Sequence, residues 1–179
     1  MSGVGALVSS CKAAVSPKPA RWIRIDKSVP WSFFDGAWKH NSNISSVGCL
    51  LYFSHSHFIK FKAWIGLRSN NYAELQALRL LLKCAKDQNI KNMQVFNNSS
   101  LVINWIKESG YLHNIHLRSM GDLLWEVAVS FEHITFTHVY RNLNQDAGRV
   151  SKEGRHLDAS LMSFEEADEG ISVITSSSL

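Results

Sequence analysis

The sequence predicts an α/β domain in which a mixed five-stranded sheet, three antiparallel strands and then two parallel ones, is flanked by helices. Two observations carry this prediction. Aromatic and apolar runs joined by short turns come first, at residues 31–38, 47–53 and 57–65, and two further β-prone runs then alternate with helical patterns. Strands joined by short turns pair antiparallel, whereas strands reached across helices lie parallel.

Each element follows from its own pattern, and together they give the order β-β-β-α-β-α-α-β-α. The first run, WSFFDGAW, ends in an Asp-Gly dipeptide that is typical of a turn, and SHSH is typical of a hairpin tip. Leucines recur at helical spacing in the segment that follows the third run. From there we expect a helix over 70–88, a strand over 92–96, helices over 100–109 and 116–131, a strand over 133–140 and a helix over 144–154.

Composition places the folded domain at residues 29–157, between two tails. Residues 1–28 are rich in small residues and basic, with five basic and one acidic side chain in 1–27, which predicts a disordered tail; an organelle transit peptide is the alternative. Residues 158–179 are acidic and rich in serine, which predicts a second tail. The segment 28–153 carries 13 basic and 9 acidic residues, a balance that suits a polyanionic partner without requiring one.

The cellular setting follows from cysteine use and hydropathy. Three scattered cysteines, Cys11, Cys49 and Cys84, form no C-x-x-C pair, which favours a reducing compartment. No apolar run approaches the roughly 20 residues of a transmembrane helix. We therefore expect a monomer in the cytoplasm or nucleus without a membrane partner.

Two carboxylates fall where a plain core would not place them. Asp35 stands on an aromatic strand, and Glu74 lies on the same helical face as the apolar Leu78 and Leu81. A turn role for Asp35 and a buried cationic partner for Glu74, such as Arg68 or Lys83, are the structural explanations. The functional explanation is that both carboxylates converge on a magnesium ion.

Four motifs resemble ribonuclease H type 1 in consistent order and spacing across residues 31–157. They are FFDGAW, RSNNYAELQAL, VFNNSSLVINWI and THVYRNLNQDAGRVSKEG, and they are closest to the version in plant retrotransposon polyproteins. The resemblance implies an RNase H-like fold and cleavage of the RNA strand of an RNA–DNA hybrid.

In that family four carboxylates hold two Mg²⁺ ions, because two divalent ions near each other need nearby anions. The resemblance implies that Asp35 and Glu74 are the first two carboxylates. The third and fourth positions hold Asn98 and Gly148, which carry no charge. We therefore expect one weakly bound Mg²⁺ at most and strongly reduced hydrolysis. Asn98 can also cap the helix that begins near Ser99.

Nucleic-acid binding in the family rests on other residues. The resemblance implies that Asn70 and Asn71, preceded by Ser69, contact the sugar-phosphate backbone in the minor groove. Either asparagine could also cap the helix that follows. Further cations near the motif ends are candidate phosphate contacts: Lys39, His40, Arg68 and Lys107.

Three hypotheses follow for the function of the chain. The first is an RNase H domain that binds hybrids but has lost most of its nuclease activity. The second is an active metal-dependent hybrid ribonuclease. The third is a protein-interaction scaffold on an inactive RNase H fold.

Overall fold

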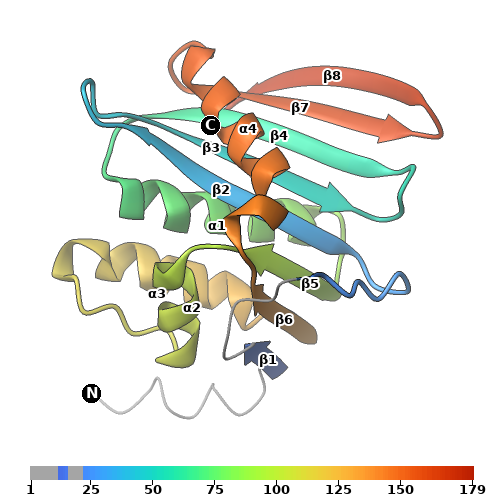
Figure 1. Cartoon of the computed structure of the whole chain (residues 1–179), viewed down its shortest axis with the longest axis horizontal. Helices are drawn as coiled ribbons and strands as arrows, with labels where there is room; N and C mark the ends of the chain where they lie inside the picture. The colour runs from blue at the N-terminus through green and yellow to red at the C-terminus, as the bar shows by residue number, and fades with distance from the viewer. Residues whose placement is uncertain (1–11, 16–21) are drawn as a thin grey trace.

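The computed structural model describes residues 12–15 and 22–179, and within them it forms one eight-stranded sheet (Figure 1). The strand order is β1-β6-β5-β2-β3-β4-β7-β8. The strands are β1 (Lys12–Val15), β2 (Trp31–Lys39), β3 (Ile44–Tyr52), β4 (Phe58–Leu67), β5 (Asn92–Asn97), β6 (His133–His138), β7 (Leu161–Asp168) and β8 (Ile171–Ser178). The helices are α1 (Asn70–Asp87), α2 (Ser100–Lys107), α3 (Arg118–Ala128) and α4 (Gln145–Glu153), with single 3-10 turns at Ile115–Leu117, Arg141–Leu143 and Gly154–His156.

The central strands confirm the mixed sheet that the sequence predicts. β2, β3 and β4 pair antiparallel, and β5 and β6 add to the β2 side in parallel. The helix order and the alternation with strands also agree with the sequence pattern. None of the described helices is long and apolar enough to cross a membrane.

The predicted strand count of five is too low, because both segments that flank the predicted domain add strands. β1 pairs parallel with β6, and β7 pairs antiparallel with β4 before β8 closes a hairpin on it. The prediction of a tail at 158–179 was therefore wrong. Phe164 of β7 packs against the core, and Glu169 and Gly170 make the turn to β8 with positive φ. The predicted tail at 1–28 lies largely outside the described residues.

Two helices cover opposite faces of the central strands, as Figure 1 shows with α4 in front of the sheet and α1 behind it. Both approach the sheet so closely that the strands need glycine. A Cβ on Gly36 would lie 2.4 Å from the backbone nitrogen of Glu74 in α1, and a Cβ on Gly48 would lie 2.1 Å from that of Ser151 in α4. Close packing at these two points fixes both helices against β2 and β3.

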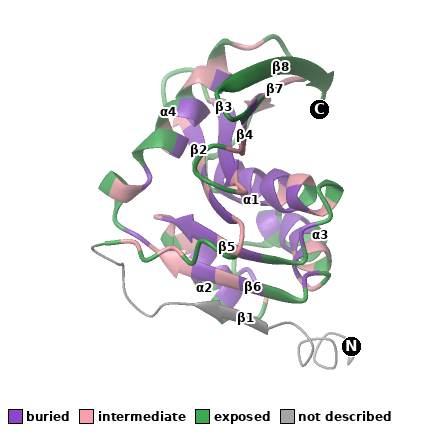
Figure 2. Cartoon of the chain, turned by 90° about the vertical axis from the view of Figure 1, so that its right-hand side faces the viewer, coloured by how far each residue is buried: buried purple, intermediate pink, exposed green. Residues whose placement is uncertain are grey.

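The Asp-Gly dipeptide is not a turn, although its sequence is typical of one. Asp35 and Gly36 lie inside β2, which continues to Lys39 and pairs Asp35 with Gly48. The glycine is required by the approach of α1 and not by backbone conformation. The main core lies between the sheet and the helices α1, α2 and α3, while β8 is exposed along its whole length (Figure 2).

Candidate functional site

Asp35 lies on the α4 face of the sheet, where it meets the side chains of that helix. The hydroxyl of Ser151 lies 2.8 Å from Asp35 Oδ2 and 2.9 Å from the carbonyl oxygen of Gly148, and it shares its one proton between these two acceptors. Burial raises the pKa of Asp35, and the Ser151 hydrogen bond with the nearby charges of Arg141 and Lys152 lowers it in part. The carboxylate is thus held by a hydroxyl and surrounded by cations.

Gly148 lies directly beside this carboxylate. A Cβ built on Gly148 would meet one atom within 4 Å, Asp35 Oδ2 at 3.7 Å. A side chain at position 148 would therefore reach Asp35 without steric conflict. The neighbouring carboxylates of α4 are engaged elsewhere: Asp146 pairs with Arg149, and Glu153 pairs with Lys62 and Arg149.

Glu74 is 7 % exposed and lies close enough to Asp35 for their charges to interact. Burial, followed by the charge of Asp35, raises the pKa of Glu74 to about 8, while the backbone amide of Gly36, the side chain of Asn97 and Arg141 lower it in part. Neither Arg68 nor Lys83 forms an ion pair with it among the residues described. Burial therefore makes Glu74 keep its proton to a higher pH than an exposed glutamate does.

This shift predicts that the free energy of unfolding falls as pH rises. Between the ordinary pKa of 4.5 and about 8, the folded state keeps a proton on Glu74 that the unfolded state has lost. The contribution of Glu74 to the free energy of unfolding is fully present below pH 4.5 and is lost as the pH rises toward 8. The loss amounts to up to about 5 kcal/mol, because one pKa unit corresponds to about 1.4 kcal/mol. Urea unfolding across this window measures the slope.

The matched control is a pair of neutralising changes. Glu74→Gln should remove most of the decrease, with the remainder coming from Asp35, whose pKa is raised in the same direction. Glu153→Gln should leave the decrease in place, because the pKa of Glu153 is lowered by its hydrogen bond to Lys62. Equal pH slopes in the unmodified chain and Glu74→Gln would contradict the assignment.

Asn98 takes part in an amide network and does not cap α2. Its Oδ1 accepts a hydrogen bond from Asn144 Nδ2 at 2.8 Å, and Asn144 Nδ2 also donates to the carbonyl of Phe34 at 2.8 Å. The capping prediction was wrong, because the N-cap is Ser99, whose backbone nitrogen donates to Asn97 Oδ1. The network joins the middle of β2 and the end of β5 to the start of α4 without any ionised group.

The predicted backbone-binding asparagines lie on the same side as the carboxylates. Asn70, Asn71, Glu74, Asp35 and Asn98 all line one cavity of about 360 Å³. Both asparagines are exposed at the start of α1. Neither is its N-cap, because the hydroxyl of Ser69 accepts the hydrogen bond from the backbone nitrogen of Tyr72.

The remaining predicted cations lie away from the carboxylates. Lys39 and His40 are exposed at the end of β2, and Lys107 is exposed at the end of α2. The guanidinium of Arg68 stacks over the Tyr72 ring at 5.1 Å from its centroid. None of these four side chains lines the two cavities beside Asp35.

Three other cations line both cavities beside Asp35, and the sequence motifs did not point to them. They are Arg141, Lys152 and Arg155. A signal for two of them was present in the sequence, since positions 152 and 155 follow Gly148 by four and seven residues and share its helical face. Arg141 comes from the loop before α4, and only the folded chain brings it to Asp35.

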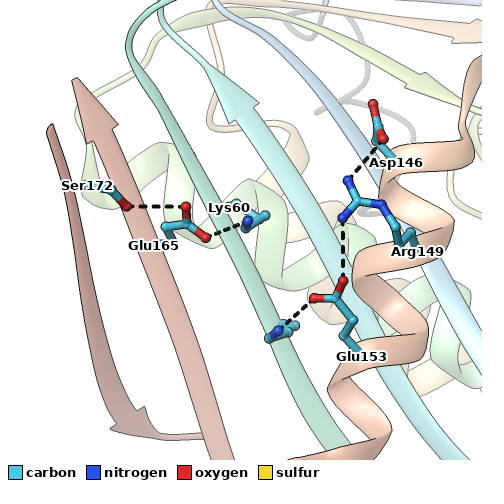
Figure 3. Close-up of polar contacts among 7 residues, drawn as sticks. Lys60, Asp146, Arg149, Glu153, Glu165 and Ser172 are labelled. Carbon is cyan, nitrogen blue, oxygen red and sulfur yellow. Dashed lines mark hydrogen bonds and ion pairs between the residues drawn. The ribbon is translucent and has the colours of Figure 1, made fainter. Parts of the chain in front are cut away.

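Arg149 lines one of these cavities but is already neutralised. Figure 3 shows its guanidinium between Asp146 and Glu153, with distances of 3.2 Å and 3.5 Å. Lys62 and Lys60 on β4 are paired in the same way with Glu153 and Glu165. Four Lys and Arg side chains line these cavities, and three of them have no carboxylate partner within 4 Å among the residues described. These three are Arg141, Lys152 and Arg155.

The donor set does not fit a pair of magnesium ions. Only two of the four positions hold carboxylates: Asp35 accepts a hydrogen bond from Ser151, and Glu74 is buried. Asn98 Oδ1 accepts a hydrogen bond from Asn144, and Gly148 has no side chain. No group of three or more His, Cys, Asp or Glu side chains suited to a metal occurs in the described part of the chain. Two divalent ions would face far less negative charge than they require.

Comparison with known proteins identifies what this site resembles. The family described as reverse transcriptase-like matches residues 33–154, which include Asp35, Glu74, Asn98 and Gly148. No curated protein matches the chain.

RNase H enzymes and domains are among the solved structures that resemble this chain. RNase H1 from Halobacterium salinarum is 26 % identical, with a TM-score of 0.64 over 70 % of this chain and 96 % of that one. The N-terminal RNase H domain of a Mycobacterium tuberculosis protein, solved as a fusion with maltose-binding protein, is 23 % identical, with a TM-score of 0.65 over 70 % and 98 %. LC11-RNase H1, solved in complex with an RNA/DNA hybrid, is 19 % identical, with a TM-score of 0.62 over 69 % and 94 %.

Proposed function

We propose that this chain, which belongs to the reverse transcriptase-like family of RNase H-like domains, binds RNA–DNA hybrids and cleaves them weakly or not at all. The family and the solved complex of LC11-RNase H1 with a hybrid support the binding part of the proposal. The observation that carries the second part is the site itself, where two carboxylates stand beside an amide and a glycine. We expect one weakly bound Mg²⁺ at most.

Binding is expected to involve the face that carries Asn70 and Asn71. Their amides line the cavity beside Asp35 and are exposed, so they can reach the 2′-hydroxyls and sugar-phosphate backbone of an A-like duplex in its wide minor groove. The cationic groups near this cavity would neutralise phosphates. An origin in a plant retroelement, a monomeric state and a location in the cytoplasm or nucleus stay predictions from the sequence.

A binding titration tests the proposal. Fluorescence anisotropy with a short labelled RNA–DNA hybrid should show binding that weakens steeply with salt, because each neutralised phosphate releases counterions. Asn70→Ala with Asn71→Ala should lower the affinity about 30-fold, because two lost hydrogen bonds of about 1 kcal/mol each total about 2 kcal/mol. Asn104→Ala, an exposed asparagine on α2, is the matched control and should bind like the unmodified chain.

The same preparation tests cleavage. With Mg²⁺ present, the labelled RNA strand should stay intact under conditions in which an intact RNase H1 degrades it. Absence of hybrid binding at low salt would overturn the proposal and favour the scaffold hypothesis. Cleavage at a rate comparable to that of an RNase H1 with all four carboxylates would show that the chain is an active ribonuclease.

A further inference from the structure

We infer that the two cavities beside Asp35 form a metal-independent phosphate pocket, in which Arg141, Lys152 and Arg155 contact a phosphodiester of the bound nucleic acid directly. This inference rests on the proposed function. It names the side chains that contact the sugar-phosphate backbone beside Asp35, Glu74, Asn98 and Gly148. It also states that this contact needs no divalent ion.

The geometry supplies one continuous cationic region on both sides of Asp35. The cavity toward α4 has a volume of about 410 Å³ and the cavity toward α1 about 360 Å³. Five residues line both cavities: Asp35, Asn98, Arg141, Lys152 and Arg155. Three of these five side chains carry a positive charge and one is a carboxylate, so the shared surface is cationic.

The sign of the charge separates this site from a magnesium site. A two-metal site must concentrate negative charge to hold its ions. Here the third and fourth anionic positions are neutral, and the cations Arg141 and Lys152 lie near enough to lower the pKa of Asp35. A cationic cavity repels divalent metal ions and attracts phosphate.

The cations of the pocket are free to contact a ligand. Arg141 and Lys152 are exposed and Arg155 is half-buried, and no carboxylate of the described chain lies within ion-pair distance of any of them. Within the described part of the chain, the side chain of Arg155 makes one hydrogen bond, from Nε to the carbonyl of Lys152 at 3.3 Å, so its terminal nitrogens stay available. Guanidinium groups present paired donors that match phosphate oxygens.

The space for the phosphate comes from Gly148 and from the start of α4. With no side chain at position 148, the volume beside Asp35 Oδ2 belongs to the cavity. Gln145, the first residue of α4, lines the same cavity, and no side chain caps the N-terminus of this helix. The positive end of the helix dipole therefore adds to the attraction for an anion.

A charge-matched pair of double variants tests the pocket. Arg141→Ala with Lys152→Ala should lower hybrid affinity about tenfold or more and reduce the slope of log K against log salt by about 2, as expected for two lost phosphate contacts. Arg79→Ala with Lys83→Ala removes the same two residue types from α1, outside both cavities, and should stay within about twofold of the unmodified chain. Circular dichroism shows whether each variant is folded.

Metal independence has its own measurement. The affinity of the unmodified chain should be the same in EDTA as in Mg²⁺, whereas Gly148→Asp should weaken binding in EDTA by placing a carboxylate in the pocket. Inorganic phosphate, used as a probe without any hybrid, should shift the amide NMR resonances of Gly148 and Lys152 in the unmodified chain. The same probe should leave the resonance of Gly148 unshifted in the Arg141→Ala, Lys152→Ala variant.

The outcomes separate this inference from the proposed function. Hybrid binding by the unmodified chain, with equal affinity and salt slope in the pocket variant, would overturn the pocket and leave the proposed function standing. Affinity that rises steeply with Mg²⁺ would also overturn it. A chain that binds no hybrid but shows the phosphate shifts would overturn the proposed function and leave an anion pocket.

Discussion

Supplying both missing carboxylates, by Asn98→Asp together with Gly148→Asp, is expected to raise the rate of Mg²⁺-dependent hybrid cleavage about 100-fold or more over the unmodified chain. Two metal ions stabilise the attacking and leaving oxygens by several kcal/mol, and each 1.4 kcal/mol is about tenfold in rate. The measurement is release of labelled RNA fragments from a hybrid in single-turnover conditions.

The structure accepts both changes without rearrangement. The Cβ of residue 148 would stand 3.7 Å from Asp35 Oδ2, so a carboxylate there would lie beside Asp35 and add negative charge to the site. Asn98→Asp keeps an acceptor oxygen where Asn98 Oδ1 now receives a hydrogen bond from Asn144.

Gly148→Asn in place of Gly148→Asp, in the same Asn98→Asp background, is the neutral control, because it adds nearly the same volume without charge. A comparable rate in the unmodified chain and the double variant would contradict catalytic impairment. A double variant that neither cuts nor binds would favour the scaffold hypothesis. A neutral control that cuts as fast as the double variant would show that cleavage needs no charge at position 148.

Gly48→Ala is expected to destabilise the fold by about 3 kcal/mol or more, the upper end of the range for overpacked cores. Its Cβ would lie 2.1 Å from the backbone nitrogen and 2.6 Å from the Cα of Ser151, and a backbone contact cannot be relieved by a rotamer change. α4 would have to move away from the sheet and would carry Ser151 and Gly148 away from Asp35. Urea unfolding monitored by tryptophan fluorescence measures the loss.

Gly148→Ala is the matched control for this prediction. It makes the same chemical change in the helix that covers this face of the sheet, but its Cβ would make only an ordinary van der Waals contact, with Asp35 Oδ2 at 3.7 Å. We expect it to stabilise the fold by up to about 1 kcal/mol, the difference in helix propensity between the two residues. Similar stabilities for Gly48→Ala and the unmodified chain would contradict the close approach of α4.

Glycine use shows why sequence reasoning locates some features of this chain and misses others. Asp-Gly at positions 35 and 36 favours a turn as a dipeptide, but here the strand continues and the glycine makes room for α1. The reason for the residue lies in a helix almost forty positions away. Local pattern cannot distinguish these two uses of glycine.

The C-terminal end of the chain shows a related limit. The acidic and serine-rich composition of 158–179 is typical of a tail, yet β7 and β8 extend the sheet. Lys60 and Lys62 on β4 present positive charge to this side of the sheet, and Glu165 of β7 pairs with Lys60. The composition of a segment gives its charge. Whether a neighbouring strand neutralises that charge depends on the fold.

The sequence by itself determined the order of the central elements, because hydrophobic period and turn length act locally, and it placed Asp35, Glu74, Asn98 and Gly148 in one set through their motifs. The tertiary structure alone decided the charge of the site. Arg141, Lys152 and Arg155 meet Asp35 only because α4 and the loop before it pack against β2. Electrostatic interactions depend on distance in space, and the burial that raises the pKa of Glu74 depends on every element packed around it.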